Sequence, residues 1–307
     1  MKILAGASGT QYEINGHGYR AVITEVGACL RVLEYRDRPL IVSFDVDEPM
    51  VAYRGALCAP WPNRTADGIY SVDGVSHQLR VNEPSRNCAL HGLVFDSVWH
   101  VVKHTPGEVV LGLRLLATDA YPFQLDLRIS YSITPGGLLT TVEAENSGPG
   151  IAPYGVCPHP YLRAGHSALD TWTLTLPAEE FLQVSPDRLL PLALENVDDG
   201  SFDFRQPREI GSTEVDHAFT GIIRDENGLA SVTVREPSGS GVSMIFGQSC
   251  PWVQIHTADL PDPARSRLGV AVEPMTCPPD AFNSQTDLIR LGPGAAHQAS
   301  WTIRAVE

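Results

Sequence analysis

The sequence has little helical periodicity, few positive charges and no long apolar run. No window carries an apolar stripe at i, i+3, i+4 and i+7 over three turns, which argues against a helical fold. No apolar run approaches the roughly 18 residues that span a bilayer, and the apolar stretch at residues 1–6 is too short for a secretory signal. Lysine and arginine number 22 against 36 acidic residues, a formal net charge of −14. Because the chain lacks the basic surface that binds a phosphate backbone, we expect neither a membrane nor a nucleic-acid partner.

The six cysteines are scattered and form no C-x-x-C pair, so we expect no zinc site. Free, dispersed cysteines are typical of a reduced, cytoplasmic protein. Cys157 and Cys277 lie beside motifs described below, but no adjacent basic group is present to lower a thiol pKa, which favours a packing role for both. A glycine-rich phosphate loop and a nucleophile elbow are missing as well. We therefore predict no metal and no cofactor.

Period-two alternation of apolar and polar residues dominates the sequence. The clearest case runs from Phe123 to Ile133, and the turn at residues 134–137 leads into a second alternating stretch at residues 138–145. Such alternation is typical of half-buried antiparallel strands. A turn is expected at Asn15-Gly16. Further strands are expected at residues 12–14, 19–25, 172–176, 232–235, 242–246, 252–257 and 300–306.

The turn-forming residues are spread along the whole chain. The 24 prolines and 27 glycines do not concentrate in a linker, and no internal repeat is present. A length of 307 residues is compatible with one large domain. A single sheet of so many strands would curl or split into two packed, twisted layers. We predict one all-β, mostly antiparallel domain over residues 1–307.

A glutamate near the C-terminus is the first candidate for chemistry. The apolar stretch Gly269–Val272 leads directly to Glu273, and Pro274 biases the glutamate toward an extended backbone. Further prolines restrict the loop that follows. A carboxylate held at the end of a strand by a stiff loop is suited to act as a catalytic base. The alternative is a glutamate that ends a strand in water.

A histidine between two prolines is the second candidate. Pro158 and Pro160 restrict the backbone around His159. Histidine can give or take a proton near neutral pH, so a fixed imidazole is suited to proton transfer. The alternative is a structural histidine that packs on Tyr154 and Tyr161.

Four further residues are candidates for substrate binding. His91 precedes a glycine, which would let a ligand approach closely; the alternative is a histidine in a surface turn. Asn63 and Arg64 offer directional donors beside the flat face of Trp61, a combination that suits a polyhydroxylated ring; the alternative is a proline-rich turn. Asp216 is a weaker candidate, because aspartate is common where a strand begins.

Five motifs together make the chain resemble the aldose 1-epimerase (mutarotase) family, and within it the bacterial mutarotase-like branch. The resemblance covers nearly the whole length and implies a β-supersandwich fold with a sugar cleft across one sheet. It also implies that Glu273 is the general base and His159 the general acid, while His91, Arg64 and Asp216 hold the sugar. The motifs, in the family's order, are Pro62-Asn63-Arg64, Leu90-His91-Gly92, His159-Pro160-Tyr161-Leu162, Asp216-His217-Ala218-Phe219, and Glu273 with Pro279-Asp280-Ala281-Phe282-Asn283.

The sequence departs from the better-known members of that family at two places. Pro158 stands where they carry asparagine, and Leu162 follows Tyr161 directly. The spacing from Glu273 to Asp280 is also one residue longer. Both departures lie beside the expected catalytic pair and bear on substrate identity more than on reaction class.

The expected activity is interconversion of the α and β anomers of a free hexose by general acid and base catalysis, with the two groups on opposite sides of the sugar ring. A sugar is the only partner expected. One alternative is a carbohydrate-binding protein without catalysis. Another is an epimerase of a hexose 6-phosphate or other anionic sugar, for which cations could come from Arg54, Arg64, Arg80 and Arg86.

Overall fold

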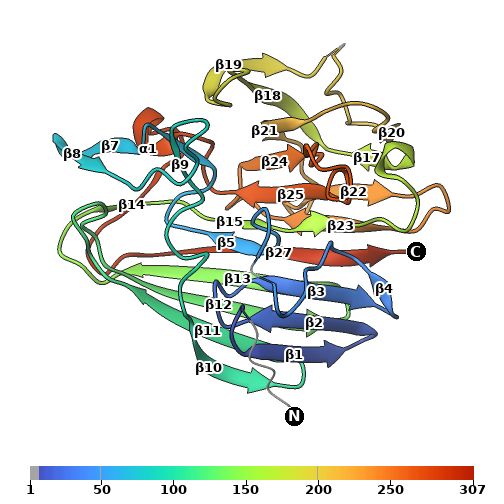
Figure 1. Cartoon of the computed structure of the whole chain (residues 1–307), viewed down its shortest axis with the longest axis horizontal. Coiled ribbons are helices and arrows are strands. Elements are labelled where there is room, and N and C mark those ends of the chain that lie inside the picture. The colour runs from blue at the N-terminus through green and yellow to red at the C-terminus, as the bar shows by residue number, and fades with distance from the viewer. Residues whose placement is uncertain (1–6, 49, 199) are drawn as a thin grey trace.

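The computed structural model describes residues 7–48, 50–198 and 200–307, and it consists mainly of antiparallel strands (Figure 1). The apolar stretch at residues 1–6 lies outside the described residues. A long sheet has the strand order β10 (His100–Thr105), β11 (Glu108–Leu115), β12 (Leu125–Thr134), β13 (Gly137–Asn146), β27 (Ala296–Val306), β23 (Gly241–Phe246), β22 (Ala230–Arg235), β17 (Thr173–Thr175) and β20 (Arg208–Glu209).

Two further sheets and several strand pairs complete the architecture. The second sheet has the order β16 (Tyr161–Leu162), β25 (Val270–Met275), β24 (Trp252–His256), β21 (Asp216–Ile222), β18 (Ala178–Val184) and β19 (Pro191–Asn196). The third is the meander β1 (Gln11–Gly16), β2 (Tyr19–Thr24), β3 (Leu30–Tyr35) and β4 (Arg38–Pro39). The pairs are β5 (Ala56–Cys58) with β15 (Cys157–His159), β6 (Arg64–Ala66) with β9 (Cys88–Leu90), β7 (Ile69–Val72) with β8 (Val75–Gln78), and β14 (Ala152–Tyr154) with β26 (Ile289–Leu291).

Helical structure is short where it occurs. A 3-10 turn, η1, covers Leu169–Thr171, and one helical turn, α1, covers Ala281–Ser284. No helix in the described ranges is both long and apolar enough to cross a membrane. The antiparallel sheets confirm the all-β class that the alternating sequence predicts.

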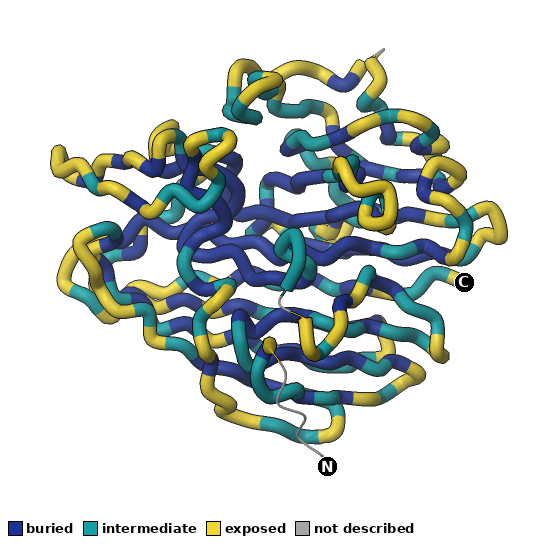
Figure 2. Tube along the Cα trace, in the orientation of Figure 1, coloured by how far each residue is buried: buried dark blue, intermediate teal, exposed yellow. Residues whose placement is uncertain are grey.

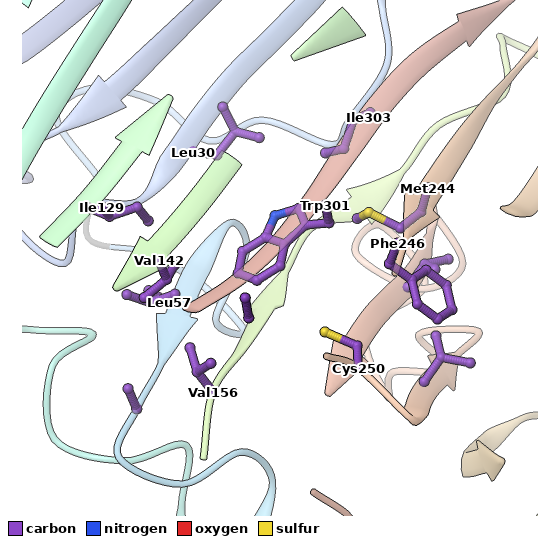
Figure 3. Close-up of a cluster of buried hydrophobic side chains, with 14 of the residues drawn as sticks. Leu30, Leu57, Ile129, Val142, Val156, Met244, Phe246, Cys250, Trp301 and Ile303 are labelled. Carbon is purple, nitrogen blue, oxygen red and sulfur yellow. The ribbon is translucent and has the colours of Figure 1, made fainter. Parts of the chain in front are cut away.

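A continuous apolar core joins the sheets. Buried segments fill the centre of the molecule, and exposed ones follow its edges (Figure 2). Trp301 of β27 lies in the middle of this core, between Leu57 and Val142 on one side and Met244 and Phe246 on the other (Figure 3). Truncating such a buried aromatic side chain typically costs about 3–5 kcal/mol. This cluster therefore fixes how β5, which pairs with the strand of His159, meets the long sheet.

The prediction of one domain over residues 1–307 stays a prediction.

One local prediction is wrong. Asn15 and Gly16 are not the turn of the first hairpin; they pair with Arg20 and Tyr19, and the turn is His17-Gly18. Both turn residues have positive φ, 49° and 82°, which is the backbone twist that a tight hairpin requires. An Asn-Gly pair is a strong turn signal, but here the register of Tyr12 and Ile14, both buried, overrides it.

Candidate active site

Glu273 does not end its strand, contrary to the sequence prediction. It lies inside β25, directly opposite Gln254 of β24, and Pro274 continues the strand opposite Val253. Only 2% of Glu273 is exposed, which rules out the alternative of a glutamate in water. The carboxylate therefore stands on the floor of a cavity and not at its rim.

His159 comes from a different strand pair and meets this carboxylate. It closes β15 opposite Ala56, and its carbonyl accepts a hydrogen bond from Gly55 N at 2.8 Å. Its Nε2 lies 3.3 Å from Oε1 of Glu273, and both side chains are buried. The two groups, 114 positions apart in sequence (273 − 159), therefore face each other directly. They stand side by side and not on opposite sides of a ring-sized gap.

Aromatic rings hold the imidazole of His159 in place. The ring of His91 stands edge-on to it at 4.9 Å between centroids, Tyr161 lies at 5.2 Å and Tyr53 at 6.1 Å. Tyr154, the other expected neighbour, packs on His297 instead. The alternative of a purely structural histidine packed on Tyr154 and Tyr161 is thus only half matched, and it leaves the contact with Glu273 unexplained.

Burial shifts the proton affinities of this pair in opposite directions. Loss of water, with a smaller contribution from the charge of nearby His256, lowers the pKa of His159 to about 3. Loss of water also raises the pKa of Glu273 well above its usual value, with a further contribution from Asp216. Both shifts disfavour a charged side chain in a dry cavity. Burial of both side chains therefore favours an uncharged imidazole beside a protonated carboxyl, with one proton between them.

A buried thiol supports the other carboxylate oxygen. Sγ of Cys157 lies 3.7 Å from Oε2 of Glu273. Burial raises the pKa of Cys157 well above its usual value, so the thiol keeps its proton and can donate it. Cys157 is thus a packing residue that also orients Glu273.

Asp216 lies two strands away from Glu273 in the same sheet. It begins β21 opposite His256, while Gln254 of the intervening β24 donates from Nε2 to its Oδ1 at 2.7 Å. Nδ1 of His256 is 3.9 Å from the other carboxylate oxygen. Gln254 thus stands between the strands of the two acids and bonds only Asp216, and among the described residues its buried Oε1 has no hydrogen-bond partner. That oxygen is free to accept a hydrogen bond from a ligand hydroxyl.

Arg64 reaches the same cavity from β6, held by a carboxylate that sequence reasoning missed. Its Nε and Nη2 donate to Glu83 at 2.8 and 2.9 Å, a bidentate pair with both side chains largely buried. Burial alone would lower the pKa of Arg64, but the bonds to Glu83 raise it above its usual value. Oδ1 of Asn63 accepts from the Arg64 backbone N at 2.9 Å and from Nη1 at 3.3 Å.

We expect Glu83→Ala to lower the free energy of unfolding by about 3–5 kcal/mol, because it leaves the buried Arg64 charge unpaired. The control is Arg86→Gln, since Arg86 bonds the same carboxylate at 2.9 Å but is more exposed. The control should change the free energy by less than about 1 kcal/mol. Urea denaturation of both variants measures the difference. Equal stabilities would mean that Glu83 does not stabilise Arg64.

The strand of Arg64 is itself fixed by the C-terminal motif. Backbone N of Asp280 donates to the Arg64 carbonyl at 2.7 Å, and Oδ1 of Asp280 accepts from Ala66 N at 2.9 Å. Phe282 packs against Trp61 at 5.4 Å between centroids. Residues 279–283 therefore position the guanidinium and do not line the cavity themselves.

His91 also faces the cavity, but its glycine has a different role from the one predicted. A side chain at Gly92 would come within 2.0 Å of the Ala59 carbonyl oxygen, so the glycine makes room for backbone and not for a ligand. His91 is 5% exposed, which excludes a surface turn. Burial, together with the charge of His159, lowers its pKa well below the usual value. Within the described ranges its buried Nδ1 has no partner.

These side chains enclose one small cavity of about 140 Å³, with Ala52, Tyr53 and Leu260 beside them. The predicted residues Asn63, Arg64, His91, His159, Asp216 and Glu273 all line it. A larger hollow of about 1100 Å³ lies over β1–β3 and is lined by none of them. The smaller cavity is the better candidate for catalysis, because the acid–base pair lines it.

The cavity also holds donor types that bind metals. Potential ligand atoms of His91, His159 and Glu273 all lie within 4.8 Å of one another. Neutral imidazole and carboxylate are ligands that Zn²⁺ accepts, so this cluster could hold a divalent cation. The expectation of no metal and no cofactor stays a prediction.

Besides Glu83, which holds Arg64 from outside the cavity, sequence reasoning missed several residues that line it. Gln254 and His256 lie on one face of β24, while Val253 and Ile255 on the other are buried in the core. This polar alternation within an apolar strand was a usable signal. Tyr53 and Leu260 lie on irregular loops, where no periodicity could identify them.

Comparisons with known proteins identify the family of the chain. The family model for aldose 1-epimerase matches residues 10–304. The Escherichia coli (strain K12) protein YihR is 34% identical over 298 residues, covering 96% of this chain and 93% of that protein. Galactose mutarotase of Sus scrofa is 25% identical, covering 84% of this chain and 81% of that enzyme.

Solved structures share the fold over the whole length. An aldose epimerase homologue from C. elegans superimposes with a TM-score of 0.85 at 21% identity, covering 97% of this chain and 99% of that one. Galactose 1-epimerase from Lactobacillus acidophilus gives a TM-score of 0.81 at 18% identity, covering 100% and 98%. The fold is thus the galactose mutarotase-like β-supersandwich, and the chain belongs to the aldose 1-epimerase family of isomerases.

Proposed function

We propose that the chain interconverts the α and β anomers of a free hexose. Glu273 takes the proton from the anomeric hydroxyl, and His159 gives one to the ring oxygen as the bond between C1 and the ring oxygen breaks. The open-chain aldehyde rotates about C1–C2 and closes on its other face, with the two roles reversed. The observation that carries this proposal is the 3.3 Å contact between Nε2 of His159 and Oε1 of Glu273, two buried side chains that line one cavity.

The side-by-side arrangement suits this chemistry. The two oxygens that exchange protons, the anomeric hydroxyl and the ring oxygen, are bonded to the same carbon. An acid and a base in contact can therefore reach both. Arg64, Asn63, His91 and Asp216, together with Gln254, would hold the other hydroxyls, since their donors and acceptors face the same cavity.

The pKa shifts favour the protonation state that the pair reaches when the ring opens. Before ring opening the pair must be carboxylate and imidazolium; after it, both groups are uncharged. Burial raises the pKa of Glu273 and lowers that of His159, so the dry cavity favours the uncharged state. Ring opening is thus accompanied by neutralisation of a buried charge pair, which lowers the energy of the open-chain complex.

One consequence is an unusual pH dependence. The pair keeps its single proton from about pH 3, where His159 takes up a second one, up to the raised pKa of Glu273. We expect the enzymatic rate in excess of buffer catalysis to be flat between about pH 5 and about pH 7.5. Polarimetry on fresh α-galactose across this range measures it. A titration near the usual histidine pKa of 6.5 would contradict the one-proton pair.

A sugar-binding protein without catalysis fits the site less well. Binding needs hydrogen-bond donors and acceptors, which Arg64, Asp216 and Gln254 already provide. It does not need a carboxylate and an imidazole in contact without water, an arrangement that costs free energy to bury. Calorimetric binding of a hexose with no rate enhancement would favour this alternative.

The cytoplasmic location stays a prediction.

A further inference from the structure

Three side chains of the cavity form a compact cluster of possible metal ligands. The ligand atoms of His91, His159 and Glu273 all lie within 4.8 Å of one another. Each residue comes from a different element: His91 directly follows β9, His159 ends β15, and Glu273 lies inside β25. The strands β15 and β25 run beside each other (Figure 1). The fold, and not a local turn, therefore brings the three side chains together.

The backbone holds the three residues in place. His91 has a φ of 62°, a left-handed conformation that costs free energy for a residue other than glycine. Its N–H donates to the Asn63 carbonyl at 2.9 Å, which fixes this conformation. The carbonyl of His159 is bonded by Gly55, and Glu273 is paired with Gln254 inside the sheet. Backbone strain of the kind at His91 is concentrated at sites that bind ligands.

The separation of the ligand atoms fits a tetrahedral ion. In a zinc site with bonds of about 2.0–2.2 Å, two ligand atoms lie about 3.3–3.5 Å apart. Nε2 of His159 and Oε1 of Glu273 are 3.3 Å apart, so one ion can bind both with little movement of either. The His91 nitrogen needs a shift of about 1 Å to reach the same ion. Its buried Nδ1 has no hydrogen-bond partner among the described residues, so no bond there opposes the shift.

The charges around the cluster match a divalent cation. Arg64 and Asp216 line the cavity with the cluster, and Glu83 bonds Arg64. When Glu273 is ionised, the carboxylates of Asp216, Glu83 and Glu273 stand against the guanidinium of Arg64. This leaves a formal excess of two negative charges, which one divalent cation neutralises.

We propose that His91, His159 and Glu273 bind Zn²⁺, and that the bound ion excludes the sugar. Imidazole and carboxylate ligands with an open fourth position suit Zn²⁺ better than Mg²⁺, which prefers six oxygen ligands. The ion inhibits the enzyme and is not its cofactor, because it occupies both groups that move protons in the proposed reaction. The metal site stands on geometry alone, whereas the competition with sugar rests on the proposed function.

The surroundings of His159 limit the affinity. A zinc-bound histidine usually donates its second ring N–H to a protein acceptor. Nδ1 of His159 has no such partner in the described part of the chain. We therefore expect Zn²⁺ to bind about 10- to 100-fold more weakly than at a site that has this partner, and to be removed by a chelator.

The first test measures binding directly, with Co²⁺ as a coloured substitute for Zn²⁺. Titration of the whole protein with CoCl₂ should give the visible absorption of a four-coordinate ion, and ZnCl₂ but not MgCl₂ should displace it. His91→Gln and Glu273→Gln should each weaken Co²⁺ binding by about 10-fold or more, since each removes a ligand. A Co²⁺ affinity that neither variant changes overturns the site.

His256→Gln is the matched control for these variants. His256 lines the same cavity, and its Nδ1 lies 3.9 Å from the Asp216 carboxylate, but it is outside the cluster. The change should leave the Co²⁺ affinity and spectrum as they are. If His256→Gln loses the ion while His91→Gln keeps it, the ion lies beside Asp216 and the proposal is wrong.

The second test measures whether the ion and the sugar exclude each other. ZnCl₂ at about ten times its dissociation constant should raise the apparent KM for anomer exchange of galactose about 10-fold with kcat unchanged, and EDTA should restore it. A KM that does not change, or a loss of kcat alone, overturns the exclusion. If no sugar exchanges faster with the protein while Co²⁺ still binds through the three residues, the proposed function fails and the metal site stands. The two failures are therefore distinct.

Discussion

Glu273→Gln is expected to slow anomer interconversion by about 10²–10⁴, the usual contribution of one well-placed proton-transfer group. Glutamine has the shape of glutamate but cannot take the hydroxyl proton. The fold should persist, because burial already disfavours a charge at this position and the amide replaces it without leaving an unpaired ion. Polarimetry on fresh α-galactose gives the rate, and urea denaturation gives the stability.

Glu195→Gln is a suitable control for this variant. Glu195 is an exposed carboxylate on β19, at the edge of the sheet that holds Glu273. The same chemical change there should leave the rate as it is. If Glu273→Gln remains as fast as the parent protein, Glu273 has no part in the proton transfer.

The second large effect concerns His159 and its coupling to Glu273. His159→Gln should also lower kcat by about 10²–10⁴, since the ring oxygen loses its proton donor. The double variant His159→Gln/Glu273→Gln should be little slower than either single one. The two side chains lie 3.3 Å apart and serve the same ring-opening step, one taking a proton from the sugar and the other giving one, so removing either interrupts the same cycle.

Single-turnover polarimetry of the four proteins, parent, two single variants and the double variant, measures this coupling. If the two residues contributed independently, the fold-reductions in rate of the two single variants would multiply in the double variant. A double variant whose loss equals the product of the two single losses would show that the residues do not act as a pair.

The all-β class could be predicted because apolar and polar residues alternate along half-buried strands. Residues 123–133 and 138–145 carry that pattern and form β12 and β13 in register, Ile129 opposite Val142. The location of Glu273 within its strand could not be predicted in the same way. Pro274 indicated the end of a strand, but β25 continues through it, because antiparallel pairing with Val253 does not need the missing N–H at that position.

Residues of the candidate site could be predicted only where a side chain capable of proton transfer lies in a segment whose backbone the sequence restricts. His159 between two prolines was identifiable, and so was the carboxylate after an apolar strand. The contact between Gln254 and Asp216 depends on which strands are neighbours, and the order β25-β24-β21 is not encoded in local pattern. Glu83, the bidentate partner of Arg64, lies 19 residues away in an irregular segment where apolar and polar residues follow no regular spacing.

The most direct test of the account is exchange between α and β anomers, measured by NMR exchange spectroscopy with and without the protein. We predict that at least one hexose exchanges at a rate proportional to protein concentration, and that Glu273→Gln removes nearly all of this increase. Anomer exchange at the buffer rate for every sugar, at protein concentrations that bind the sugar, would contradict the central claim.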